Sequence, residues 1–281
     1  MPERELIVVA SGGYEGCVTR RIPGFQDVTV WSRLGDKVMG EDAEVLSDGR
    51  HRVVMLPFKS EGEDVQVAVK RFGRQSGWKD RYDRLRGTKA QRSFEAARLL
   101  EERKVGTPEP LAYMNHWEGG RLVESYFVTV YEHGMVCFRD ELLNLYENDP
   151  DVRRVEKLLK GVAEFVRRMH AAGFAHRDLG NQNIFMRRTP EGVWCDFQTL
   201  DLNRGRMKEV LSLHERARDF DRMRVPGILL YTLMANYLQS DPEPAFLRAV
   251  DRYRARFQLH ARTARWRRPF RKKRAGGAYP A

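Results

Sequence analysis

The chain has 281 residues, 42% of them apolar, which is enough to bury the core of one large domain or of two lobes. Its formal net charge is +11, but residues 252–281 hold eleven Lys and Arg and no acid, whereas residues 1–251 are neutral. The neutral body argues against a uniformly basic nucleic-acid-binding surface.

The three cysteines, Cys17, Cys137 and Cys195, are far apart and form no CxxC pair. This pattern argues against a disulfide framework or a zinc site and suits a reducing compartment. No apolar run approaches the roughly 18 residues of a membrane span, and acidic residues near the N-terminus argue against a secretory signal. We expect a cytoplasmic protein, at most peripheral on the inner face of the cytoplasmic membrane.

The first half of the chain has the pattern of a sheet. Residues 1–30 show no clear pattern and are treated as an N-terminal extension of unclear role. From Glu44 to Phe72, alternating apolar residues between short turns predict three strands, and residues 73–87 predict a loop. A helix over 89–104 and a strand over 123–131 follow.

The second half of the chain is helical in pattern. Apolar residues step by three and four from Val152 to Met169, which predicts a long helix ending near Gly173. Further elements are expected at residues 183–188 (strand), 193–202 (strand), 226–238 (helix) and from 246 into the basic tail (helix). The helix over 226–238 is apolar all round and is therefore expected to be buried. These two halves predict an α+β fold with two unequal lobes joined near residues 132–134.

The strongest chemical signal is HRDLGNQN, residues 176–183, directly after the long helix. Phosphoryl transfer needs a carboxylate that orients the attacking hydroxyl and oxygen ligands for Mg²⁺ on the same rigid loop. Asp178 suits the first role and Asn183 the second, while His176 would hold the loop backbone. A solvent-facing turn also uses Asp and Asn, but the full HRDLxxxN pattern between a helix and a strand favours catalysis.

A second signal is VAVK, which ends on Lys70 in the third predicted strand. A lysine there can pair with nucleotide phosphates if a carboxylate fixes its rotamer, and Glu95 lies on the next helix, where that partner is expected. The alternative is a surface lysine and a glutamate on a solvated helix face. The turn SDGRH, residues 47–51, has a single glycine and is a weak phosphate-binding loop, although its backbone N–H groups could approach phosphates.

A second metal-binding carboxylate is expected after the catalytic loop, and two candidates exist. Asp196 lies thirteen residues after Asn183, a spacing familiar from protein kinases, but in the middle of a predicted strand. Asp201 lies at the end of that strand, where a side chain can enter a cleft. We favour Asp201.

These motifs resemble the protein-kinase-like superfamily and, within it, the lipopolysaccharide core kinases (the Kdo/heptose kinase family) of Gram-negative bacteria. The resemblance covers about residues 45–224 and rests on VAVK, FEAARLLEERKVGTPEPLA, TVYEHG, MHAAGFAHRDLGNQNIF and LDLNRGRM. That family replaces DFG by Asp, a hydrophobe, a polar residue and Arg, so LDLNR supports Asp201. The missing Gly-rich loop departs from protein kinases.

The resemblance implies a two-lobed protein-kinase-like fold with an antiparallel-sheet N-lobe (31–133) and a mostly helical C-lobe (134–251). It implies ATP- and Mg²⁺-dependent phosphorylation of a sugar hydroxyl, on heptose or Kdo, in a lipid-linked core oligosaccharide. The implied site residues are Asp178 as the catalytic Asp, Asn183 and Asp201 for Mg²⁺, Lys70 and Glu95 for phosphate, and the backbone of Tyr131, Glu132 and His133 for adenine.

The basic tail, residues 252–281, interleaves its cations with aromatic residues. We expect it to lie on the anionic inner-membrane surface or to contact anionic acceptor groups. An acidic protein partner, single-stranded nucleic acid or a merely solvated end are the alternatives, and nucleic acid is the least favoured. The rival functions are a small-molecule or protein kinase of the same superfamily and a pseudokinase-type nucleotide-binding docking module.

Overall fold

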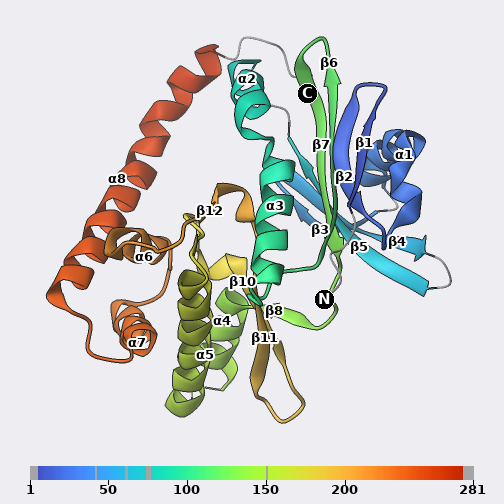
Figure 1. The fold of residues 1–281 in the computed structure, drawn as a ribbon. Helices are drawn as coiled ribbons and strands as arrows, with labels where there is room; N and C mark the ends of the chain where they lie inside the picture. Colours follow the sequence, from blue (N-terminus) through green and yellow to red (C-terminus); the bar gives the residue numbers. More distant parts are fainter. Residues whose placement is uncertain (1–5, 42, 61–62, 74–76, 150, 275–281) are drawn as a thin grey trace.

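Seven antiparallel strands build the first half of the chain into one sheet, in the order β1-β2-β6-β7-β5-β4-β3 (Figure 1). The computed structural model of the chain describes residues 6–41, 43–60, 63–73, 77–149 and 151–274. The strands are β1 (Leu6–Ser11), β2 (Tyr14–Thr19), β3 (Glu44–Asp48), β4 (His51–Ser60), β5 (Glu63–Phe72), β6 (Pro110–Glu118) and β7 (Arg121–Val130). Because β2 pairs with β6, the N-terminal hairpin enlarges the sheet at one edge.

The alternation of β5 decides which face of the sheet carries Lys70. Val67 and Val69 are buried in a core that includes Trp31 of α1 (Val28–Met39). Successive side chains of a strand point to opposite faces, so Ala68 and Lys70 lie on the other face, where both line a cavity. The strand pattern therefore positions the lysine away from α1.

Helix α3 (Lys89–Glu102) connects the sheet to the second half of the molecule (Figure 1). It begins at Thr88, whose hydroxyl accepts from the backbone N–H of Gln91 at 3.2 Å, a standard N-cap. Phe94 contacts the ring of Tyr113 in β6, with centroids 5.4 Å apart. Leu100 belongs instead to the core cluster of the helical half. One helix is thus packed against both lobes.

In the described residues of the second half, five helices and two small sheets are present. The helices are α4 (Phe138–Asn148), α5 (Val152–Ala171), α6 (Leu213–Asp219), α7 (Gly227–Leu238) and α8 (Pro244–Arg274). The small sheets contain β8 (Met135–Cys137), β10 (Ile184–Arg188) and β11 (Trp194–Thr199), and β9 (Phe174–Ala175) with β12 (Arg206–Met207). Short 3₁₀ turns are η1 (Pro23–Gln26), η2 (Asn181–Asn183) and η3 (Leu202–Arg204).

The chain leaves α5 through Gly173, shortly before HRDLGNQN (residues 176–183), the catalytic motif expected from the sequence. Gly173 has φ +80°, and a Cβ there would lie 1.9 Å from the carbonyl oxygen of Lys208. Only glycine tolerates both the left-handed backbone and this close approach. The helix end predicted near Gly173 is confirmed.

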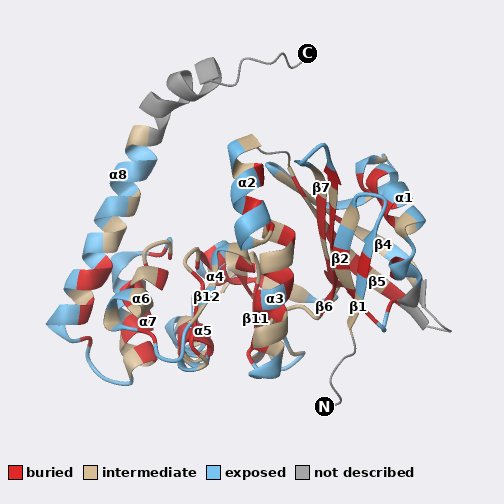
Figure 2. Ribbon diagram, turned by 45° about the horizontal axis from the view of Figure 1, so that its top comes forward, coloured by how far each residue is buried: buried red, intermediate tan, exposed pale blue. Residues whose placement is uncertain are grey.

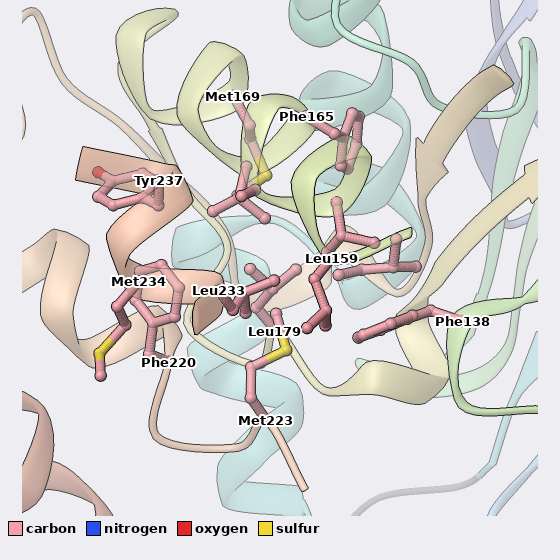
Figure 3. Close-up of a cluster of buried hydrophobic side chains, with 14 of the residues drawn as sticks. Phe138, Leu159, Phe165, Met169, Leu179, Phe220, Met223, Leu233, Met234 and Tyr237 are labelled. Carbon is pink, nitrogen blue, oxygen red and sulfur yellow. The ribbon is translucent and has the colours of Figure 1, made fainter. Parts of the chain in front are cut away.

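The core of the helical half reaches the catalytic motif itself. Figure 3 shows Leu159 and Met169 of α5 together with Leu233 of α7 and Leu179. Leu179 follows Asp178 directly and is fully buried. Burying such a side chain contributes about 1.5–3 kcal/mol, so the catalytic motif is anchored by the core.

The two-lobed α+β fold is confirmed, with a large antiparallel sheet before residue 134 and mostly helices after it. The loop predicted over 73–87 is wrong, because α2 (Gly77–Arg86) lies there. Its protein-facing side carries the buried Asp80 and Asp83 instead of apolar residues, which hides the helical periodicity. Strands β1, β2 and β6 and helix α1 were not predicted either.

The prediction that the apolar helix over 226–238 is buried all round is wrong in part. In α7, Leu233 is fully buried, but Ile228 is 71% exposed. Figure 2 shows that the long helix α8, which includes the first part of the basic tail, extends away from the rest of the molecule. Residues 275–281 and the side chains of 264–274 lie outside the described residues. Within the described part of the chain, every helix is too short or too polar to cross a membrane.

Candidate active site

Two adjoining cavities, each of about 370 Å³, form a cleft between the sheet and the helical lobe. Both cavities are lined by residues of both lobes, among them Val53, Ala68, Thr129, Phe185 and Leu200. One cavity ends on Lys70, Asn183 and Asp201, and the other on Tyr131 and Glu132. An apolar slot with a charged end suits a ligand that has a flat ring and a polar tail.

Lys70 and Asp201 meet at the polar end of this cleft. Lys70 Nζ donates to Asp201 Oδ1 at 2.7 Å, and Asn203 Nδ2 donates to the same oxygen at 2.6 Å. Burial acts to raise the pKa of Asp201, but the charge of Lys70 and the nearby His176 and His51 outweigh it and hold the pKa below its usual value. Asp201 is therefore an ionised carboxylate at neutral pH.

Glu95 does not form the predicted ion pair with Lys70. It is exposed, and Gln91 Nε2 donates to it at 2.9 Å. Ser93, which is buried, is the residue of α3 that lines the cleft beside Lys70. Two positions along a helix differ by about 200°, so with Ser93 in the cleft Glu95 faces away from it.

The backbone of the catalytic motif is held by a buried carboxylate. Asp219, the last residue of α6, is fully buried and accepts from the backbone N–H groups of His176 at 2.7 Å and Arg177 at 2.6 Å. Arg177 has φ +64°, a left-handed conformation that a non-glycine residue adopts only when its surroundings enforce it. His176 Nε2 donates to Leu200 O at 2.8 Å, which ties the motif to the residue before Asp201. The structural role expected for His176 is confirmed.

The side chain of Asp178 is held by two arginines. Arg222 Nη1 donates to its Oδ1, and Arg204 Nη1 lies 2.9 Å from its Oδ2. Asn183 Nδ2 donates to the backbone carbonyl of Asp178 at 2.9 Å. Because Asn183 and Asp201 line the same cavity, these bonds bring Asp178, Asn183, Asp201 and Lys70 into one constellation.

Asp196, the second candidate carboxylate, lies outside the cleft. Its side chain is 60% exposed and pairs with Arg187 at 3.3 Å. It does not line either cavity of the cleft. Of the two candidates, Asp201 is the one beside Lys70.

Of the three residues expected to contact adenine, only two line the cleft. Tyr131 and Glu132 line the second cavity, but His133 does not. The carbonyl of His133 accepts from Arg187 Nη1 at 2.6 Å. The backbone N–H of Tyr131 donates to Gln66 O at 2.9 Å, so this N–H is not available for a hydrogen bond to the adenine ring.

Oxygen donors for a metal ion are present at the polar end of the cleft. Both described bonds to Asp201 use Oδ1, and Asn183 donates through Nδ2, so Asp201 Oδ2 and Asn183 Oδ1 have no donor among the described residues. The described part of the chain holds no cluster of three or more His, Cys, Asp or Glu suited to a metal. One carboxylate and one amide oxygen fit Mg²⁺ bound together with phosphates and water, since Mg²⁺ rarely uses an all-protein cage.

A sequence model of the lipopolysaccharide kinase (Kdo/WaaP) family matches residues 36–228. The chain belongs to this family. Members of the Kdo/WaaP family are kinases that act on sugar hydroxyls, so the protein is a phosphotransferase. A solved structure described as "WaaP in complex with acyl carrier protein" superposes with a TM-score of 0.55 at 18% identity, over 81% of this chain and 95% of that one. No curated protein matches the chain in sequence.

In this Kdo/WaaP kinase the structure adds three residues that sequence analysis did not single out. Asp219 supports the catalytic motif from α6, and Arg204 and Arg222 pair with Asp178. Arg204 could have been found, because it is the arginine of LDLNR. Asp219 and Arg222 lie in an acid- and arginine-rich stretch, RARDFDRMR, in which the sequence gives no sign of which charges are buried.

Proposed function

We propose that this kinase transfers the terminal phosphoryl group of ATP to a sugar hydroxyl, on heptose or Kdo, of a lipid-linked lipopolysaccharide inner core. The observation that carries the proposal is the joining of Lys70, Asn183, Asp201 and the Asp178 loop at the polar end of an apolar cleft. Family membership supports the class of acceptor. The remaining choice, between heptose and Kdo, is open to direct assay.

The two ends of the cleft would bind different parts of ATP. The adenine ring would lie between Ala68 of the sheet and Leu200 of the helical lobe, near Tyr131 and Glu132. Lys70 would bind phosphate, and Asn183 and Asp201 would hold Mg²⁺ through their donor-free oxygens. When bound, Mg²⁺ neutralises the charge that develops on the transferring phosphoryl group. This use of Lys70 exchanges its bond to Asp201 for bonds to phosphate.

Asp178 would orient the attacking hydroxyl and accept its proton. Each carboxylate oxygen has two acceptor positions, so the bonds from Arg204 and Arg222 leave room for a hydroxyl donor. The two arginines also fix the direction of the carboxylate. Phosphoryl transfer depends mainly on such positioning, because little covalent work is left to the protein.

Replacing Asp178 tests the proposed reaction. Asp178→Ala should lower kcat for phosphorylation of core oligosaccharide by roughly 10²–10⁴-fold, with ATP affinity changed by less than about threefold. Asp196→Ala, which removes an exposed carboxylate outside the cleft, is the matched control and should keep its activity. Mass spectrometry of the product identifies the phosphorylated sugar. Near-wild-type turnover of Asp178→Ala, or no phosphate gained by the oligosaccharide with the wild-type protein, would remove this proposal.

We propose in addition that the basic tail brings the enzyme to the anionic inner face of the cytoplasmic membrane, where the acceptor is anchored. Support comes from its charge and from the projection of α8 away from the lobes (Figure 2). The chain should co-sediment with vesicles that contain anionic lipid and not with zwitterionic ones. The solved WaaP is in complex with acyl carrier protein, so a protein partner is the rival. Equal sedimentation with both vesicle types, together with binding to acyl carrier protein, would favour that rival.

A further inference from the structure

A separate pocket of about 360 Å³ reaches Asp201 and is walled by α2, by the start of α3 and by the turn between β3 and β4. Its wall includes Asp201 and Arg204, and Arg204 pairs with Asp178 at 2.9 Å. Neither Lys70 nor any residue of the adenine end of the cleft lines it. The pocket is thus joined to the catalytic constellation but distinct from the nucleotide cleft.

The pocket carries more positive charge than its carboxylates balance. Arg92 pairs with Asp83 at 3.3 Å, and Asp201 is occupied by Lys70. The remaining cations are Arg50, Lys79 and Lys89, and none of them forms an ion pair within the described part of the chain. Three cations without an ion pair around one pocket favour the binding of an anion.

The charges of this pocket are close enough to act on one another. Burial, with Arg50 next, lowers the pKa of Lys89 to about 8; Asp83 opposes this shift, and Lys79 and Arg92 add to it. An anion in the pocket would reverse this effect by favouring the protonated amine. The unfavourable crowding of cations is therefore relieved when a negative ligand binds.

Helix α2 is fixed on one side and presents two aromatic rings on another. Asp80 accepts from Arg121 at 3.1 Å, and the guanidinium of Arg84 lies 4.0 Å from the ring centroid of Trp117. Trp78 and Tyr82 stay 70% and 47% exposed, and both line the pocket. Residues four apart share a helix face, so the two rings form one surface beside the cations.

We propose that this pocket is the acceptor subsite, in which Arg50, Lys79 and Lys89 bind an anionic group of the sugar acceptor. Trp78 and Tyr82 pack against the sugar, as flat amphipathic rings do in ligand pockets. The anionic group is a carboxylate or a phosphate carried by the oligosaccharide next to the hydroxyl that reacts. This inference rests on the proposed function, since it names the class of acceptor that the same site takes.

The test compares two charge reversals on α2. Lys79→Glu should raise KM for core oligosaccharide by about tenfold or more, with KM for ATP changed by less than about twofold. Arg81→Glu makes the same change of charge on an exposed residue of the same helix outside the pocket and should leave both constants near wild type. Equal effects of the two variants, or an increase confined to KM for ATP, would overturn the subsite.

A second pair of variants tests the aromatic surface. Trp78→Ala should raise KM for the oligosaccharide by about fivefold, while Leu85→Ala, 87% exposed on the same helix outside the pocket, should not. Two treated acceptors then distinguish the sources of charge. Phosphatase treatment abolishes the difference between wild type and Lys79→Glu if the ligand is a phosphate, and carboxyl reduction does so if it is a carboxylate. A difference that survives both treatments contradicts the proposal.

Calorimetric titration with the oligosaccharide in the absence of ATP separates this inference from the proposed reaction. Binding by the wild type and by Arg81→Glu, but not by Lys79→Glu, supports the subsite even if no phosphate is transferred. Transfer without any loss of binding in Lys79→Glu supports the reaction and removes the subsite. Absence of binding by the wild-type protein overturns the subsite whatever the turnover.

Discussion

The catalytic motif and helix α3 each supply polar residues to the cleft, but they are fixed in different ways. The motif is continuous, and its backbone is held by Asp219 and by the burial of Leu179 in the core (Figure 3). In α3, Glu95 occupies the sequence position expected for the partner of Lys70 and nevertheless faces solvent. Asp201 takes its place.

The difference shows what sequence spacing determines. Residues within one short loop keep their mutual geometry because few backbone dihedrals separate them. A pair formed between a strand and a helix depends on the rotation of the helix about its axis, and about 100° per residue is enough to turn a side chain out of a cleft. A chain can therefore contain both residues of an expected ion pair, here Lys70 and Glu95, without the two being in contact.

The largest expected effect tests the carboxylate that does meet Lys70. Asp201→Asn removes the ionised group at the polar end of the cleft and should lower kcat/KM by about 10³-fold or more. Asp196→Asn is the matched control, because it changes an exposed carboxylate five residues earlier. Activity is measured across a Mg²⁺ titration. If Asp196→Asn were the inactive variant, the cleft would not be the site of transfer.

Parts of the fold were predictable from apolar periodicity, although the apolar strand β6 was missed. The strands from Glu44 to Phe72 and the helix ending before Gly173 follow from periodicity alone. Helix α2 was missed because its packed side is made of Asp80 and Asp83, which pair with Arg121 and Arg92 outside the helix. A search for periodic apolar residues therefore does not predict such a helix.

The second test removes the support of the catalytic motif. Asp219→Asn replaces an acceptor of two backbone N–H groups by an amide that accepts through one oxygen only, and should cost about 3 kcal/mol in the free energy of unfolding. Urea denaturation measures this, and kcat should fall as well. Asp140→Asn, which breaks an exposed pair with Arg139, should cost less than about 1 kcal/mol. Equal losses in the two variants would show that the motif does not depend on Asp219.

The candidate site was predictable in its geometry where its residues share one motif. Asn183 and Asp201 line the same cavity, Asn183 donates to the backbone carbonyl of Asp178, and Asp196 lies outside the cleft. Arg222, which also holds Asp178, comes from a segment whose charges look solvent-exposed in the sequence. Its position is set by tertiary packing, such as its contact with Phe257 of α8, 4.9 Å from the ring centroid.

The third test compares the lysine of the sheet with the glutamate of α3. Lys70→Ala should lower kcat/KM by about 100-fold because it removes the cation of the cleft. Glu95→Gln should change kcat/KM by less than about threefold, since Glu95 contacts Gln91 and not Lys70. Steady-state kinetics at varied ATP measures both. A loss for Glu95→Gln as large as for Lys70→Ala would mean that α3 rotates to form the missing pair when nucleotide binds.

The smallest effect concerns the electrostatic cost of the carboxylates gathered at the catalytic motif. Burial raises the pKa of Asp221 to about 6, and Asp219 and Asp178 add to the effect, although Arg222 and Arg218 oppose it. A carboxyl whose pKa is higher in the folded state binds more protons there between about pH 4 and 6, so stability falls as the pH rises through this window. Above it, the penalty is present in full.

Asp221→Asn removes that penalty and should stabilise the protein at pH 7.5 by about 1–2 kcal/mol, but hardly at pH 4.5. Thermal denaturation at the two pH values measures the difference, and Asp241→Asn, at an exposed carboxylate, is the control that should show none. The burial of Asp221 beside the catalytic motif would then lower the free energy of unfolding at neutral pH. The exposed Glu95 of α3 carries no such penalty. Equal changes at both pH values would instead assign the effect of Asp221→Asn to hydrogen bonding, and the two regions would no longer differ in this respect.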